Sequence, residues 1–389
     1  MLILNAKTIA NMLAWGIFAF SLFSEPNLTY GQIRPVRFIP LGDAPGGDFC
    51  SSASAASADG RVVVGNGVND RGPVALRWTE QEGITEIPPA YPEKKYRSTA
   101  RGVSSDGNTV IGESSSTASF RGVNMSQGYI WTAEKGIHLL GSLPGGFPAS
   151  AARAVSGDGT IVVGQVAVKG GAKGFTWTLA QGMNKIPSSS TVLPQDAWRI
   201  TSDGIATVGV ATEFTNDGPL LFSNGKRGRR VAFRILNTGE PEALGILPEH
   251  FSSVAMDASR KGKYVVGGNQ KKRGGGSQAF IWDATQGMRG LGYLPEHDNS
   301  RATAISDNGR IVVGFSASGK ENQTAFIWTR GTGIQNLQTL AETAGIDLNG
   351  WLLIYASDIS ADGSTIVGSG TNPQGKPEGW IMRLTGAAK

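Results

Sequence analysis

The most suggestive polar residues of this sequence occur in two copies of one short motif. The first copy, LPEHF, holds Glu249 and His250, and the second, LPEHD, holds Glu296, His297 and Asp298. Imidazole and carboxylate groups can contact a polar ligand, but a metal site needs three or four ligands that converge on one point. Two interpretations stay open: a ligand-contacting rim, or turn chemistry that was duplicated together with its repeat.

A second group of residues that could bind a ligand is basic. These residues lie in the loops expected between the second and third strands of the repeats described below. Basic residues outnumber acidic ones in these loops, although the net charge of the whole chain is only +5. A positive field on one side of a protein attracts anionic partners such as an acidic polysaccharide or a cell-envelope surface. The alternative is solvated decoration that keeps the protein soluble. The surplus peaks in the third to fifth repeats, and Lys320 follows in a later loop. The binding candidates taken from this surplus are Lys226, Arg227, Arg229, Arg230, Lys271, Lys272 and Arg273.

An aspartate recurs in a motif that begins S-x-D-G, and its repetition raises the question of calcium. Calcium requires six or more oxygen ligands around one point. Asp-Gly and Asn-Gly are also the residues that favour two-residue hairpin turns, which need positive φ angles. We interpret these residues as turn formers: Asp59, Asp106, Asp158, Asp203, Asp307 and Asp362.

Catalytic signatures of the common kinds are missing. The chain contains no GxSxG, HExxH, P-loop or dinucleotide-binding motif, so we expect no cofactor and more readily a binding protein than an enzyme. The enzymatic alternative is a glycosidase or lyase, which needs two carboxylates across a central pocket. Its candidate carboxylates are Asp43, Asp48, Glu249, Glu296 and Asp298.

These residues are positioned by short apolar runs that end in turn residues. The stretch 298–337 contains four such runs, rich in β-branched and aromatic residues, which is the pattern of a four-stranded meander. Its DG-type hairpin recurs at intervals of about 50 residues, a period typical of β-propeller blades. The seven copies lie at 57–65, 104–112, 156–164, 201–209, 258–267, 306–314 and 360–368.

The arrangement of the repeats predicts a closed ring. Seven third strands but only six fourth strands follow the hairpins, and a spare fourth-strand motif, VRFIPLGDAPGG, precedes the first repeat. We therefore predict an all-β fold, a seven-bladed propeller of four-stranded antiparallel blades whose last blade is closed by 36–42. An open β-solenoid is the alternative, but it has no use for a strand moved from one end to the other. The expected blades are 36–90, 91–143, 144–193, 194–247, 248–294, 295–340 and 341–384.

Two further residue types have mainly structural interpretations. Six tryptophans recur at one position of the third strand, where packing between blades is favoured over an aromatic platform for sugars: Trp78, Trp131, Trp177, Trp282, Trp328 and Trp380. Cys50 is the only cysteine, so neither a disulfide within the chain nor a cysteine-based metal site is expected. A helical turn is expected only at 340–345.

The composition and the N-terminus bear on location. The chain of 389 residues has 55 Gly and 17% charged residues, which suits many tight turns around a real core. A short apolar run at 12–23, followed by polar residues, is typical of a secretory signal, which we place at 1–31; an uncleaved anchor is the alternative. No later run is long enough to span a membrane. We expect a secreted, periplasmic or extracellular protein that is monomeric and binds no specific nucleic acid.

The repeat motifs together resemble those of the HAF-type extracellular repeat proteins. The resemblance rests on SADG-x-x-VVG, AF-x-WT and G-M-x-x-LG-x-LPGG, and it covers about 37–384. It implies secretion and propeller-like repeats, and it implies no catalytic residue. Two departures are visible: Arg234 replaces the tryptophan of the fourth repeat, and two LPGG turns have become LPEH. The favoured hypothesis is a non-enzymatic binding module for an anionic partner, and a purely structural envelope protein is a further alternative.

Overall fold

The computed structural model describes residues 33–91, 96–120, 123–221, 225–237, 239–271, 275–319 and 322–386. The described chain belongs to one compact unit that begins at Ile33. The predicted signal segment 1–31 lies outside the described residues, as do Lys272, Arg273 and Lys320.

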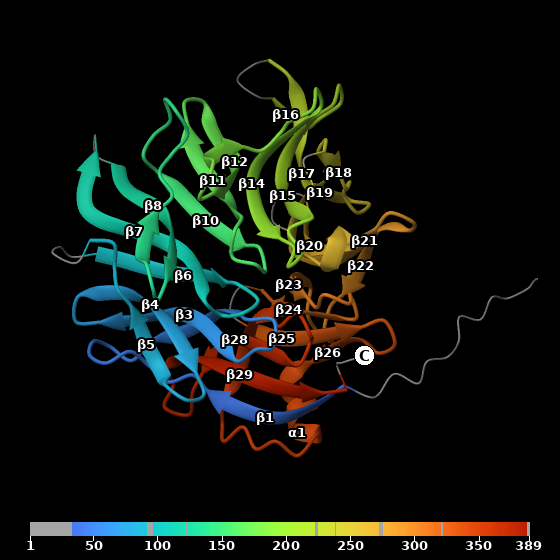
Figure 1. Cartoon of the computed structure of the whole chain (residues 1–389). Coiled ribbons are helices and arrows are strands. Elements are labelled where there is room, and N and C mark those ends of the chain that lie inside the picture. The colour runs from blue at the N-terminus through green and yellow to red at the C-terminus, as the bar shows by residue number, and fades with distance from the viewer. Residues whose placement is uncertain are drawn as a thin grey trace, which may run out of the picture. The chain divides into compact units, whose positions relative to one another are not determined.

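The described residues form seven antiparallel sheets around one axis, which is the predicted seven-bladed β-propeller (Figure 1). The first, innermost strands are β2(Ser51–Ala56), β6(Tyr96–Val103), β10(Ser150–Val155), β14(Val192–Ile200), β19(His250–Ala258), β23(Asn299–Ile305) and β27(Leu352–Ile359). The second strands are β3(Val62–Asn69), β7(Thr109–Phe120), β11(Val162–Val168), β15(Ala206–Phe214), β20(Tyr264–Lys271), β24(Ile311–Ser318) and β28(Thr365–Thr371).

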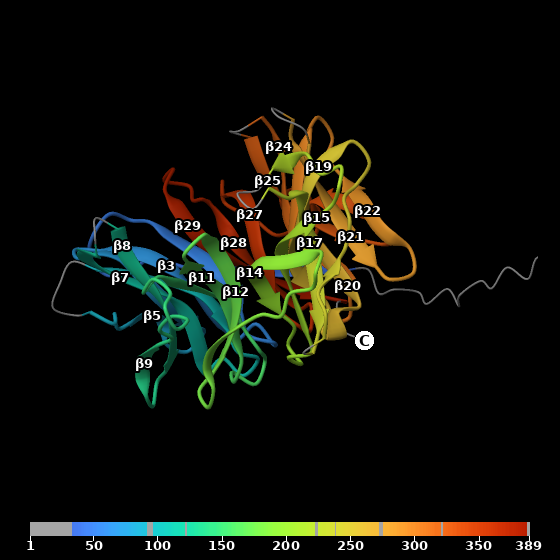
Figure 2. The same cartoon turned by 90° about the horizontal axis from the view of Figure 1, so that it is seen from above.

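The outer half of each sheet completes the blade, and Figures 1 and 2 show strands such as β22 near the periphery. The third strands are β4(Gly72–Thr79), β8(Val123–Thr132), β12(Gly171–Thr178), β17(Arg227–Leu236), β21(Ser277–Asp283), β25(Asn322–Thr329) and β29(Pro377–Thr385). The fourth strands are β5(Gly83–Ile87), β9(Gly136–Leu139), β13(Gly182–Lys185), β18(Glu242–Ala243), β22(Gly287–Gly292), β26(Gly333–Asn336) and β1(Arg34–Pro40). Blade four carries an additional short strand, β16(Leu220–Leu221), paired with β17.

The N-terminal strand closes the ring, as predicted. Strand β1 pairs antiparallel with β29, in a register that runs from Arg34 opposite Thr385 to Pro40 opposite Trp380. The last blade is thus built from both ends of the described chain, which leaves no open sheet edge between the first and last repeats.

The DG-type turns differ from the prediction in their geometry. In the first blade, Ser57 N donates to Val62 O at 2.9 Å and Gly60 N donates to Ser57 O at 2.9 Å, so the loop holds four residues instead of two. Only the glycine has a positive φ, 68° at Gly60. The carboxylate of Asp59 accepts from Ser57 Oγ at 2.9 Å and from Arg61 N at 3.0 Å. The side chain therefore serves its own turn, which supports the turn interpretation over calcium.

The sixth copy requires a further correction. Asn308, and not Asp307, occupies the turn-forming position there, because its Oδ1 accepts from Ser306 Oγ at 2.8 Å and from Arg310 N at 3.0 Å. Asp307 instead occupies the variable position that follows the serine, and its Oδ2 accepts from Ser202 Oγ at 2.6 Å.

The variable positions of neighbouring turns are hydrogen-bonded to each other around the axis. Ala58 N donates to Ser105 O, Ser105 N to Gly157 O, and Gly157 N to Ser202 O, at 2.8–3.1 Å. Between blades four and five the link is to a side chain, because Lys261 N donates to Asp203 Oδ2 at 3.1 Å. The backbone bonds resume from Arg260 N to Asp307 O and from Asp307 N to Ala361 O, and Asp362 N returns to Ala58 O. These backbone bonds draw the turns together at one end of the axis.

A serine near the start of the innermost strand fastens four of the blades to the blade before. Ser150 Oγ donates to Gly141 O at 2.9 Å and accepts from Gly128 N at 3.1 Å. The equivalent serines make the same pair of bonds and are Ser51, Ser253 and Ser300.

The core lies between adjacent blades, where the repeated tryptophans pack as predicted. Trp177 is buried beside Ile111 of the preceding blade, and Trp78 beside Ile381 of the last blade. Where Arg234 replaces the tryptophan, its guanidinium lies 4.4 Å from the centre of the Trp282 ring and pairs with Glu242 at 2.7 Å.

Helical structure within the described residues is confined to two short elements. Helix α1(Leu337–Thr343) begins earlier than the predicted 340–345, because the Asn336 side chain accepts from Gln338 N and Thr339 N and so caps its start. A 3₁₀ turn at Arg260–Gly262, which the sequence analysis did not predict, replaces the DG turn of blade five.

Candidate functional site

The innermost strand of every blade contains a β-bulge at the same place. In β10 the register with β11 shifts between Ala152 and Ala154, so Arg153 is left without a partner in the ladder. A bulge re-aims a side chain and is common beside binding sites. The bulged residues differ in chemistry from blade to blade, whereas the residues beside them are mostly small. The bulged residues are Ser54, Arg101, Arg153, Trp198, Met256, Thr303 and Ser357.

A cavity of about 440 Å³ opens beside the bulges of blades four and five. A volume of this size is in the range of small-molecule sites. Its lining is mixed, with apolar contacts from Val254 and Met256 and a set of polar and aromatic side chains. These side chains come from β11, β14, β17 and β23 and are Gln165, Gln195, Asp196, Trp198, Arg230 and Arg301.

Asp196 and Trp198 are held in place by Arg153 of the preceding blade. The guanidinium of Arg153 pairs with Asp196 at 3.2 Å and lies 4.6 Å from the centre of the Trp198 ring. Asp196 is 4% exposed, and this burial raises the pKa of its carboxyl even though Arg153 acts in the opposite direction. On its other side Arg153 lies 3.6 Å from Glu113, which also lies 3.4 Å from Arg101.

Two arginines of the lining are available for an anion. Within the described residues neither Arg230 nor Arg301 has an ion pair or a hydrogen bond from its side chain. Arg230 is exposed, and Arg301 is half-buried against the backbone of β20. A Cβ on Gly268 would lie 3.1 Å from Arg301 Nε, so the glycine leaves room for the guanidinium.

The opposite end of the channel is filled by a buried charge cluster. Arg199 of β14 donates from Nε to Asp257 Oδ1 at 2.8 Å and from Nη2 to Asp358 Oδ1. Asp257 also accepts from Ala258 N and Ile305 N, both at 2.8 Å. Asp358 accepts from Ala56 N at 3.1 Å. The cluster thus has contacts with five blades.

The ionisation of this cluster follows from its surroundings. Burial alone would lower the pKa of Arg199, but the two carboxylates outweigh it and raise that pKa above its ordinary value. Burial also raises the pKa of Asp358, and Arg199 partly offsets this effect. Arg199 is the positive charge that lies against the two buried carboxyl groups of the cluster.

The predicted basic residues are distributed differently from the prediction. Arg227, Arg229 and Arg230 belong to strand β17 and not to a loop, because this strand continues alongside β15 to Phe214. Arg229 is paired with Glu213 at 2.6 Å, and Arg227 donates to Gly218 O at 3.2 Å. Of the predicted basic residues that are described, only Arg230 lines the cavity.

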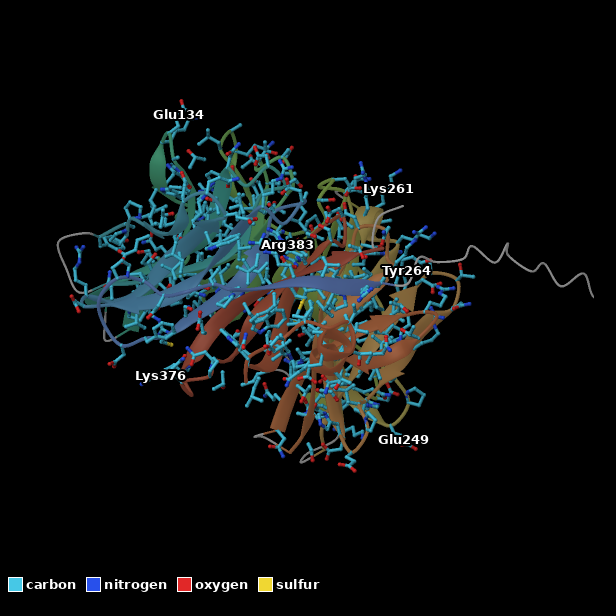
Figure 3. The ribbon with its side chains drawn as sticks, turned by 90° about the horizontal axis from the view of Figure 1, so that it is seen from below. Glu134, Glu249, Lys261, Tyr264, Lys376 and Arg383 are labelled. Carbon is cyan, nitrogen blue, oxygen red and sulfur yellow. The ribbon has the colours of Figure 1, made fainter. Side chains whose placement is uncertain are left out.

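The two predicted lysines that are described lie over aromatic rings. Lys226 Nζ is 5.4 Å from the centre of the Phe214 ring, and Lys271 Nζ is 5.4 Å from the centre of the Tyr293 ring. They belong to the face of the propeller that carries the loops between second and third strands. Figure 3 shows Glu249 and Lys376 on this side and Lys261, of the 3₁₀ turn of blade five, on the other.

The LPEH turns show backbone strain and no assembled metal site. Glu249 and Glu296 have φ angles of 65° and 63°, where the LPGG and APGG copies have glycine. Both glutamates and Asp298 are exposed, while His250 and His297 are half-buried. His250 Nδ1 lies 2.7 Å from Pro248 O. Across the described residues, no three His, Cys, Asp or Glu side chains lie close enough to hold a metal ion.

The carboxylates that approach the channel were not the predicted ones. Asp43 accepts from Cys50 N at 3.0 Å, Asp48 is exposed, and neither lines the cavity. The carboxylates that do so, Asp196 in the large cavity and Asp257 and Asp358 in the cluster, were missed. One signal in the sequence could have identified them. The innermost strands consist mostly of small residues, and charged or aromatic residues interrupt these, as in QDAWRI.

Comparison with known proteins gives the fold. No protein-family profile and no curated protein matches the sequence. An oligogalacturonate lyase in complex with manganese is similar in structure, with a TM-score of 0.55, 12% identity, and coverage of 91% of this chain and 98% of that one. The chain is a β-propeller. At this identity the likeness extends to the fold alone.

Two further structures belong to the same comparison. Oligogalacturonate lyase from Vibrio parahaemolyticus has a TM-score of 0.51 and 9% identity, with coverage of 91% of this chain and 98% of that one. TolB from Acinetobacter baumannii has a TM-score of 0.43 and 14% identity over 72% of this chain, which spans 60% of the length of that protein.

No helix among the described residues is long and apolar enough to cross a membrane.

Proposed function

We propose that this protein is a secreted, non-enzymatic binding module of the HAF repeat type, and that it binds an anionic ligand in the mouth of its central channel. The observation that carries this proposal is the pair of guanidinium groups, Arg230 and Arg301, in the lining of the 440 Å³ cavity. Planar guanidinium groups bind carboxylate and related anions with two parallel hydrogen bonds.

The remainder of the lining suits an anion that is also a sugar. Trp198 offers an aromatic surface, and Gln165 and Gln195 can each donate and accept hydrogen bonds. An acidic polysaccharide, or the acidic glycan of a cell envelope, combines these features. The lyases that share the fold are named for oligogalacturonate, an acidic glycan, and this agrees with the proposed class of ligand.

A carbohydrate-active enzyme, glycosidase or lyase, is the alternative function. Hydrolysis by the usual mechanism needs two carboxylates. Among the described residues the large cavity presents one, Asp196, which already pairs with Arg153. This geometry favours binding. Incubation of the protein with polygalacturonate, followed by analysis of the glycan for shortened products, separates the two functions. A purely structural envelope protein would bind no ligand there.

The test of the proposal is retention on immobilised polygalacturonate as a function of salt. We expect Arg230→Ala with Arg301→Ala to weaken retention at least tenfold, because each lost charge-assisted hydrogen bond contributes about 1.5–3 kcal/mol. Lys226→Ala with Arg227→Ala, outside the cavity, should have a smaller effect. Arg61→Ala removes an exposed charge from the DG-turn side and serves as the matched control. Equal retention of the cavity double variant and the unaltered protein would refute the proposed site.

A further inference from the structure

The buried charge cluster crosses the channel from one side of the ring to the other. Arg199 belongs to blade four, and Asp358, which it contacts directly, belongs to blade seven on the opposite side. A side chain that joins opposite blades must pass through the axis. Arg199 and its two carboxylate partners therefore occupy the centre of the channel.

The two cavities of the channel follow one another along the innermost strands. On β14, Asp196 and Trp198 line the large cavity, and Arg199 with the residues after it lines a small one of about 80 Å³. On β19, Met256 faces the large cavity and Asp257 the small one. The charge cluster thus lies between the large cavity and the DG-type turns.

The small cavity is too small to continue the path for a polymer. A water molecule in the liquid takes up about 30 Å³, so 80 Å³ holds a few waters and no sugar ring. Beyond it, the backbone hydrogen bonds between neighbouring turns, such as Ala58 N to Ser105 O at 3.1 Å, draw the turns together around the axis. The large cavity therefore has a closed floor.

The lining of the large cavity selects among anions. The carboxyl group of Asp196 pairs with Arg153, and in its ionised form it accepts hydrogen bonds only, so a ligand group beside that form must be a donor, such as a hydroxyl. The two guanidinium groups require a negative charge elsewhere on the same ligand. Trp198 and Met256 favour a ligand with an apolar face, which the C–H face of a pyranose ring provides. A plain inorganic anion satisfies only the arginines.

We propose that the channel is a blind pocket that binds one terminal acidic sugar residue of a glycan, with its carboxylate at Arg230 and Arg301 and its ring against Trp198. This inference rests on the proposed function and adds the ligand class and the mode of entry. The rest of the glycan leaves the pocket toward the face that carries Lys226 and Lys271. Threading of a chain through the ring is excluded by the Arg199 cluster.

Calorimetric titration of the full protein with galacturonate, its trimer, and long polygalacturonate tests the proposal. We expect one protein molecule bound per trimer, and a number per long chain that stays constant when the chain length is doubled. Galactose, which lacks the carboxylate, should bind at least tenfold more weakly than galacturonate. Trp198→Ala should weaken trimer binding about tenfold, and thermal unfolding of the variant verifies that it is folded. Arg301→Ala provides a second variant.

The outcomes separate this inference from the proposed function. The number of protein molecules bound per glycan chain could instead rise in proportion to chain length, while Arg230→Ala and Arg301→Ala still abolish binding. This result would show an anion site that binds the interior of a chain, and it would overturn the blind pocket alone. Trimer binding that is insensitive to Trp198→Ala would overturn the position of the sugar ring. Failure of every acidic probe to bind would overturn both proposals.

Discussion

At the scale of single residues, the turn aspartates link stability to pH. Ser104 Oγ and the N–H of Asn108 donate to Asp106, and together they hold the pKa of that carboxyl below its usual value of 3.8 in spite of some burial. The pKa of Asp158 is lowered in the same way, first by Ser156. A lowered folded-state pKa means that the carboxylate contributes stability above the unfolded value, and that this contribution is lost as pH falls through the folded value.

We predict that the double variant Asp106→Asn with Asp158→Asn has a free energy of unfolding that depends less on pH in the acid range. The natural Asn308 shows that an amide keeps both turn hydrogen bonds. Because these side chains are largely solvated, the loss at pH 7 should be at most about 1 kcal/mol per turn. Thermal unfolding between pH 7 and about pH 2 measures the slope of stability against pH. The converse variant, Asn308→Asp, should make this slope steeper, and unchanged slopes in both variants would contradict the prediction.

The repeated tryptophans and Trp198 differ in where their side chains lie. The repeated ones are buried or half-buried in the packing between blades, which their regular position in the third strand predicted. Trp198 has no counterpart in the other repeats, and it lines the cavity because it occupies a bulge. Departure from the repeat was therefore the better guide to the residues that line the cavity.

At the scale of elements, the LPEH turns show that a turn can accept glutamate in place of glycine at a cost in conformational energy. Gly145 of the LPGG turn has a φ of 71°, and Glu249 and Glu296 adopt nearly the same angle. A non-glycine residue in this left-handed region costs about 1–2 kcal/mol. The strain therefore lies in the turn backbone at the entrance of blades five and six.

We expect Glu249→Gly and Glu296→Gly each to raise the free energy of unfolding by about 0.5–1 kcal/mol, because relief of the strain exceeds the greater entropy of glycine in the unfolded chain. Chemical denaturation measures the change. The matched converse is Gly145→Glu, where a Cβ would meet open space, so that the backbone angle alone accounts for a loss of about 1 kcal/mol. If the glycine variants instead lose affinity for polygalacturonate, the turns belong to the binding rim.

At the scale of the whole molecule, the Arg199 cluster and the closing strand β1 hold the ring together. The cluster contacts blades four, five and seven through side chains, and blades one and six through Ala56 N and Ile305 N. Strand β1 contributes the last ladder of the ring. Both features join parts of the chain that are far apart in sequence.

We predict that Arg199→Met lowers the free energy of unfolding by about 3–5 kcal/mol, because it leaves two buried carboxylates without their cation. Adding Asp257→Asn and Asp358→Asn to this variant should recover part of the loss. Urea unfolding followed by tryptophan fluorescence measures both. Arg61→Ala, at an exposed ion pair, should change the value by less than about 1 kcal/mol. An effect of Arg199→Met as small as that of Arg61→Ala would show that the cluster does not join the blades.

The sequence by itself determined the architecture. The repeated DG hairpins, the third-strand tryptophans and the fourth-strand motif displaced to Val36 specify strands, their order and the closure of the ring. This was possible because turn chemistry and strand alternation are local, and because a count of complete and incomplete repeats reveals closure. The finer geometry was less accessible: the four-residue turns and the extension of β17 through Arg227–Arg230 depend on neighbouring strands.

Only the tertiary structure decided the candidate site. Asp196, Trp198 and Arg230 come from blade four and Arg301 comes from blade six, and no motif in the sequence connects them. Their approach to one cavity depends on bulges that re-aim residues of the innermost strands and on the curvature of the ring. Arg199 likewise acquires its partners only when blade five lies beside it and blade seven faces it across the axis. Repeat patterns reveal what all the blades share, whereas a binding site in the channel is made from the positions at which the blades differ.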